Sequence, residues 1–134
     1  MLILQNKWIN RLIPFPGFRA CNIFGVLFVR GSKPLSDVTL NHERIHSAQI
    51  AEVMLASAPL AALLWVFSSG WMAGLFVLAS YYLWYVIEWA IHFTRIKDAH
   101  LAYRRVSFER EAYENQNDLN YLESRSWFKF IQFL

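Results

Sequence analysis

The residues best suited to chemistry lie in one short stretch, Asn41-His42-Glu43-Arg44-Ile45-His46. The stretch contains the motif H-E-x-x-H and belongs to a segment that is predicted to be helical. Residues four apart lie on one face of a helix, so the rings of His42 and His46 can converge on one metal ion. Glu43 can take a proton from a water molecule on that metal. Two histidine ligands, an open position for water and a carboxylate general base are the parts of a zinc hydrolase. The alternative is an ordinary solvated helix face that carries two histidines.

A two-histidine zinc site needs a third protein ligand, and a carboxylate from a separate helix is a common one. The candidates lie in a charged stretch with a helical pattern, residues 104–115, where Glu109 and Glu111 are two positions apart. Glu109 is the first candidate and Glu111 is the alternative, because the sequence does not choose between them. A solvated charged face is the other interpretation of this stretch, but the upstream H-E-x-x-H favours a ligand.

The composition points to a membrane protein. Of the 134 residues, 56% are hydrophobic and only 17% are charged, and the mean hydropathy is +0.24. This is too apolar for an ordinary soluble domain, and the length predicts a single domain over residues 1–134. The net charge is +3, but the basic residues flank apolar segments. We therefore expect attraction to a membrane surface and no nucleic-acid partner. The single cysteine, Cys21, excludes an intramolecular disulfide and a cysteine-based zinc site.

Two apolar segments, residues 51–69 and 71–93, predict a helical hairpin joined at Ser68–Gly70. Each is long enough to cross a hydrocarbon layer of ~30 Å at ~1.5 Å per residue, and Pro59 is expected to kink the first without ending it. All 13 Lys and Arg residues lie outside the hairpin. By the positive-inside rule, both termini and the H-E-x-x-H are then cytoplasmic. His46 precedes the first span by five residues, so we expect the metal roughly 8 Å above the hydrocarbon.

The remaining segments predict supporting elements. Residues 23–30 are β-branched and aromatic, which predicts a strand or one arm of a hairpin. Residues 1–22 mix aromatic and basic side chains, as an interfacial segment does, and the alternative is a loop packed on the catalytic part. We expect no cleavable signal peptide in this segment. Within the second span, Glu88 is a functional candidate because ionisable residues there are rare. Local pairing of Glu88 with His92 is favoured over a role at the metal.

The two motifs and the segments between them, roughly residues 37–115, resemble the integral-membrane gluzincins. The most similar in plan are the CaaX prenyl-proteases and the HtpX-type proteases, in which an H-E-x-x-H helix and a later E-x-E-A-D-like helix are separated by membrane spans. The matching pieces are His42–His46 and Phe108–Tyr113. This chain departs from the family pattern at Tyr113, where the family has an aspartate that orients a ligand histidine.

The resemblance implies a mainly α, membrane-embedded zinc metallopeptidase with a small zincin-like catalytic part. Its zinc ligands would be His42, His46 and Glu109, and Glu43 would be the general base. It would act on a peptide or membrane-protein substrate at the cytoplasmic face of a bacterial inner membrane. The oligomeric state is not predicted. The alternative function is a non-catalytic, metal-binding membrane scaffold or assembly factor. A peptidase also needs a donor for the developing oxyanion. Five side chains are candidates for this role: His100, Tyr103, Arg104, Arg105 and Tyr113.

Overall fold

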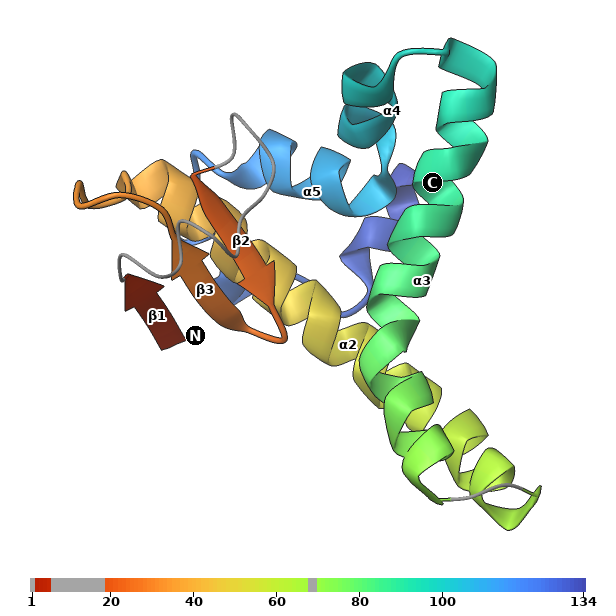
Figure 1. The fold of residues 1–134 in the computed structure, drawn as a ribbon. Helices are drawn as coiled ribbons and strands as arrows, with labels where there is room; N and C mark the ends of the chain where they lie inside the picture. Colours follow the sequence, from red (N-terminus) through yellow and green to blue (C-terminus); the bar gives the residue numbers. More distant parts are fainter. Residues whose placement is uncertain (1, 6–18, 68–69) are drawn as a thin grey trace.

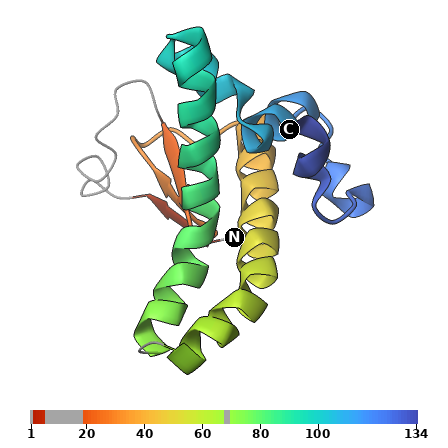
Figure 2. The ribbon, with the colours of Figure 1, turned by 90° about the vertical axis from the view of Figure 1, so that its right-hand side faces the viewer.

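Two long antiparallel helices dominate the structure, a computed structural model that describes residues 2–5, 19–67 and 70–134 (Figure 1). Helix α2 spans Asp37–Phe67 and helix α3 spans Gly70–Ile96. The two lie side by side near their connected ends and diverge toward the start of α2 and the end of α3, where helix α5 (Ser107–Asn115) lies between them (Figure 1 and Figure 2). Both are long and apolar enough to cross a membrane, by length and composition. The predicted pair of long helices is thus confirmed, and Ser68 and Ser69 of the predicted turn lie outside the described residues.

Helix α2 has two halves of different character. Its start is capped by Ser36, whose Oγ accepts a hydrogen bond from the Thr39 backbone N–H at 3.2 Å. The helix continues through Pro59, as predicted. Up to Val53 many of its side chains are buried, whereas Ala61 is the only buried residue described beyond that point. The first half is therefore packed into the folded part of the protein, and the second half presents apolar side chains outward.

A small three-stranded sheet packs beside the first half of α2. It contains β1 (Leu2–Gln5), β2 (Ala20–Ile23) and β3 (Val26–Val29) in the order β1-β3-β2, with β1 parallel and β2 antiparallel to β3. The predicted strand over residues 23–30 is confirmed as β3, but the prediction missed a turn at Phe24 and Gly25. Both turn residues have positive φ (52° and 78°), as a type I′ hairpin turn requires. Strand β1 was not predicted, and residues 6–18 of the predicted interfacial segment lie outside the described residues.

The chain after α3 returns to pack across α2. Helix α4 spans Ala99–Arg105, α5 spans Ser107–Asn115, α6 spans Tyr121–Ser124, and a 3-10 helix, η1, spans Lys129–Phe133. One hydrophobic core lies where α2, α3, the start of α5 and η1 meet. Its buried members are Ile50, Val53, Tyr81, Val106, Phe108 and Phe130.

A buried carboxylate of α3 fixes the start of α5. Glu88 accepts hydrogen bonds from the Ser107 backbone N–H at 2.7 Å and from the Ser107 hydroxyl at 2.8 Å. Negative charge is favourable at a helix N-terminus, where backbone N–H groups lack partners within the helix. Glu88 also lies 3.6 Å from Nε2 of His92, which agrees with the predicted local pairing. Glu88 therefore helps to place the helix that carries Glu109.

Candidate metal centre

Three buried side chains from two helices form a group that could hold a metal ion. His42 and His46 come from α2 and Glu109 comes from α5. The two Nε2 atoms lie 3.0 Å apart, His46 Nε2 lies 3.3 Å from Glu109 Oε1, and His42 Nε2 lies 3.5 Å from Glu109 Oε2. The structure thus brings together two residues of the H-E-x-x-H with the first candidate from the downstream acidic stretch.

The separations of the donor atoms suit a small tetrahedral cation. Zn²⁺ binds histidine nitrogen and carboxylate oxygen at about 2.0–2.2 Å, and tetrahedral geometry then places neighbouring ligand atoms about 3.3–3.5 Å apart. The two Nε2 atoms lie 3.0 Å apart, and Nε2 of His46 and Nε2 of His42 lie 3.3 and 3.5 Å from different oxygens of Glu109, so each separation is close to this value. Neutral imidazole and carboxylate are also donors that Zn²⁺ accepts readily. The residues therefore fit the ion without large rearrangement.

One oxygen of Glu109 faces His42 but lacks a hydrogen bond to any residue that the structure describes. Its Oε1 accepts a hydrogen bond from the Tyr85 hydroxyl at 2.9 Å, whereas Oε2 is buried and has no hydrogen-bond partner among the described residues. An unpaired buried oxygen is costly, and each one in a folded protein needs an explanation such as a bound ion. Burial raises the pKa of Glu109, but His46 and His42 lower it more, so the net pKa lies well below its ordinary value. Glu109 is therefore a charged carboxylate directed at the two rings.

The second ring nitrogen of each histidine, Nδ1, also has a hydrogen-bond partner. His46 Nδ1 lies 2.8 Å from Gln49 Oε1, and His42 Nδ1 lies 3.2 Å from Gln116 Oε1. Metal-binding histidines usually donate their second nitrogen to such an acceptor, which sets the ring orientation. The Nε2 atoms of both rings consequently face each other and Glu109.

Glu43 follows His42 directly and is only partly exposed. Burial raises the pKa of Glu43, which also feels the charges of both histidines and of Glu109. A carboxylate with a raised pKa is a better proton acceptor at neutral pH. The helix backbone at this point is held by β2, because Asn22 Nδ2 donates to the Glu43 carbonyl oxygen at 2.8 Å. The arrangement thus keeps the predicted general base beside the metal group.

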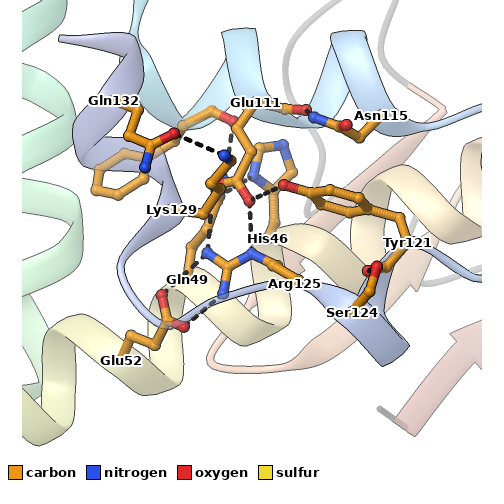
Figure 3. A network of polar contacts seen from close by, with 11 residues as sticks. His46, Gln49, Glu52, Glu111, Asn115, Tyr121, Ser124, Arg125, Lys129 and Gln132 are labelled. Atoms are coloured by element: carbon orange, nitrogen blue, oxygen red, sulfur yellow. Dashed lines mark hydrogen bonds and ion pairs between the residues drawn. The ribbon is translucent and has the colours of Figure 1, made fainter.

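Glu111, the alternative ligand, has other partners, and Gln49 lies between it and His46 (Figure 3). Residues two positions apart on a helix are separated by about 200° around its axis, so Glu109 and Glu111 point to different sides of α5. The Glu111 carboxylate accepts hydrogen bonds from Gln49 Nε2 at 3.0 Å and from the Tyr121 hydroxyl at 3.0 Å, and it pairs with Arg125. Glu111 is not part of the metal group among the described residues, which favours Glu109.

The candidates for the oxyanion donor divide into two sets. The Tyr113 ring lies 4.8 Å from the His42 ring, and the Arg104 guanidinium lies 4.5 Å from the centroid of Tyr113. Tyr103 is close enough to Glu109 for the carboxylate to raise its pKa, in addition to a larger effect of burial. Tyr103 and Tyr113 are therefore near the group, and Arg104 contacts Tyr113, although Arg104 is exposed, as His100 and Arg105 are.

Two further tyrosines reach the group from α3 and were not assigned a role from sequence. Tyr85 donates to Glu109, as described above, and the Tyr81 hydroxyl lies 3.4 Å from His46 Nδ1. The sequence does carry a signal for them, because Tyr81, Tyr85 and Glu88 share one face of an otherwise apolar helix. That polar face points at the metal group.

Comparison of the chain with protein-family models, with curated proteins and with solved structures gave no match. The assignment of a function therefore depends on the geometry of the group itself.

Proposed function

We propose that the protein is a zinc metallopeptidase with its active site at a membrane surface. The observation that carries the proposal is the buried group of His42, His46 and Glu109, in which one Glu109 oxygen lies 3.5 Å from His42 Nε2 and has no hydrogen-bond partner among the described residues. Three protein ligands with the fourth position left for water are typical of catalytic zinc sites, whereas structural sites use four. The described residues supply three ligands. Glu43 beside them is in the position of the general base in an H-E-x-x-H site.

The chemistry follows from these positions. Bound zinc would polarise the scissile carbonyl and lower the pKa of a water molecule. Glu43 takes one proton from the water as the water oxygen forms a bond to the carbonyl carbon. Glu43 then gives that proton to the leaving nitrogen as the C–N bond breaks, so the products are a carboxylic acid and an amine, which exchange a proton to become a carboxylate and an ammonium. Tyr103, which lies near Glu109, and Tyr113, which lies against His42, are the candidates to donate to the developing oxyanion, with Arg104 beside Tyr113.

We also propose that α3 and the outward half of α2 cross the inner membrane of a bacterium. Apolar side chains near the tip of the pair support this, because Val66 is 74% exposed and Phe67 is 80% exposed. All 13 Lys and Arg residues lie outside residues 51–93, which supports cytoplasmic termini and a cytoplasmic site. A C-terminal fusion to green fluorescent protein is expected to fluoresce, and a fusion to alkaline phosphatase is expected to be inactive. The opposite pair of results would contradict this orientation.

A non-catalytic metal-binding scaffold is the second candidate function. The low exposure of the three ligands favours it, since His42, His46 and Glu109 are 8%, 6% and 3% exposed. Low exposure leaves little room for a substrate to approach a bound ion, as a structural site requires. Tight zinc binding without peptide hydrolysis would support the scaffold over the peptidase.

The direct test uses the full chain, purified in detergent and then placed in lipid nanodiscs. Metal analysis is expected to find about one zinc ion per chain. Hydrolysis of a library of unstructured peptides should stop after treatment with a chelator and return when zinc is added. A chain that carries no zinc after purification and binds none on addition would rule out the peptidase.

Replacing Glu109 with glutamine is expected to lower zinc affinity by at least about 100-fold, because one charged ligand becomes a neutral amide. The measurement is competition with a fluorescent zinc chelator. Glu114→Gln is the matched control, since Glu114 lies on the same helix and is exposed. Equal zinc affinity of the Glu109 and Glu114 variants would exclude Glu109 as a ligand.

A further inference from the structure

Gln49, one helical turn after His46, is fully buried between the metal group and the Glu111 network. Its Nε2 lies 3.1 Å from the Phe108 carbonyl oxygen and 3.0 Å from Glu111 Oε2. A carbonyl oxygen and a carboxylate can only accept here, so the NH₂ group must face them. The amide therefore has one orientation, and its Oε1 faces His46 at 2.8 Å (Figure 3).

The orientation of this amide determines the state of the His46 ring. An amide oxygen only accepts, so His46 Nδ1 must carry a hydrogen. In the neutral imidazole, the lone pair is then on Nε2, the atom that faces His42 and Glu109. We propose that Gln49 is a positioning residue that holds His46 with Nε2 directed at the metal, an inference that rests on the proposed zinc site.

The network behind Gln49 keeps the amide in place. Glu111 is held by the Tyr121 hydroxyl and by Arg125, and Arg125 also pairs with Glu52 of α2. A hydrogen-bonded chain thus runs from Arg125, near the C-terminus, through Glu111 and Gln49 to His46. This explains why a carboxylate that does not belong to the metal group is fully buried next to it.

Two substitutions at position 49 separate positioning from packing. Gln49→Leu keeps a similar volume and removes the amide acceptor at 2.8 Å, which leaves only the more distant Tyr81 hydroxyl, at 3.4 Å, among the described polar neighbours of His46 Nδ1. Gln49→Glu keeps an acceptor, because either form of the carboxyl group has an oxygen for Nδ1–H, but it places a second acid against Glu111. The glutamate variant is therefore expected to be the less stable of the two, since a buried pair of acids is unfavourable.

The positioning role predicts that the leucine variant binds zinc more weakly than the glutamate variant, although the glutamate variant is the less stable of the two. Loss of an outer hydrogen bond to a ligand histidine typically lowers metal affinity 10- to 100-fold, so we expect this loss for Gln49→Leu. The glutamate variant should stay within about tenfold of wild type. Asp98→Ala is the control, because it removes the two hydrogen bonds that the Asp98 carboxylate accepts from the backbone N–H groups of His100 and Leu101 at the start of α4, and Asp98 is exposed and outside the metal group. Its zinc affinity should equal that of wild type.

The experiment measures zinc affinity by chelator competition and thermal stability of the metal-free chain for all four proteins. Weaker zinc binding by the leucine variant than by Asp98→Ala supports the inference, and this comparison stands even if the glutamate variant does not fold. The inference is overturned if the leucine variant binds zinc as tightly as wild type. It is also overturned if the glutamate variant, the less stable of the two, binds zinc more weakly than the leucine variant. Absence of zinc binding by wild type overturns both this inference and the metal centre. Zinc binding that depends on Gln49 without peptide hydrolysis supports the inference and contradicts only the peptidase.

Discussion

Replacing Glu43 with glutamine is expected to lower the rate of peptide hydrolysis by about 100- to 10,000-fold, the usual range for loss of a general base. The amide nearly matches the carboxylate in size but cannot accept the water proton. Because Glu43 is not in the metal group, zinc content should stay at the wild-type value. The measurement is kcat on a peptide cleaved by wild type, with zinc content determined on the same preparation.

The control for Glu43 is again Glu114→Gln, which makes the same chemical change at an exposed position. It is expected to retain wild-type kcat. If the Glu43 and Glu114 variants hydrolyse the peptide equally while both hold zinc, Glu43 is not the base and the proposed mechanism is wrong. Loss of zinc from the Glu43 variant would instead indicate that this residue contributes to the metal site.

The second large effect is expected from Arg125→Ala, which should lower the free energy of unfolding by about 3–5 kcal/mol. The Arg125 side chain is only 4% exposed and pairs with both Glu52 and Glu111, whose side chains are 7% and 0% exposed. Burial lowers the pKa of Arg125, but the two carboxylates raise it more, so the guanidinium stays charged. Removing it leaves two buried carboxylates without their cation, which costs more than the pair itself contributes.

The unfolding measurement is best made in detergent with a chelator present, so that altered zinc binding does not contribute. Arg105→Ala is the matched control, because Arg105 is exposed and its loss is expected to change stability by less than about 0.5 kcal/mol. The charge-neutral combination of Arg125→Met with Glu52→Gln and Glu111→Gln should recover part of the loss, since no buried charge is left unpaired. An Arg125 variant as stable as the Arg105 variant would contradict the buried network.

Local periodicity accounts for what could be predicted well. The H-E-x-x-H spacing requires only a helix to place His42 and His46 on one face, and α2 supplies that helix. The two long apolar helices were predicted from segment length and composition, and Pro59 within α2 was predicted correctly. The hairpin turn at Phe24 and Gly25 was missed because the surrounding residues form one uninterrupted apolar run.

Contacts between distant parts of the chain could not be predicted. Strand β1 pairs with β3, which lies 24 positions later, and no local pattern specifies that partner. The Arg125 side chain reaches Glu52, 73 positions away, and only packing of the C-terminal segments against α2 brings them together. For the same reason, the roles of Tyr85 and Gln49 became visible only when α3 and α5 were placed against the first half of α2.

The amino-acid sequence by itself determined which residues could bind a metal, since donor type and helical spacing are properties of short segments. It also determined the apolar helices, since their length and composition are local as well. Only the tertiary structure decided between Glu109 and Glu111. Both are acids on one short helix, and the choice depends on which side of α5 faces the two histidines. That orientation is set by the capping contact from Glu88 and by the burial of Phe108 and Ala112, which are non-local interactions.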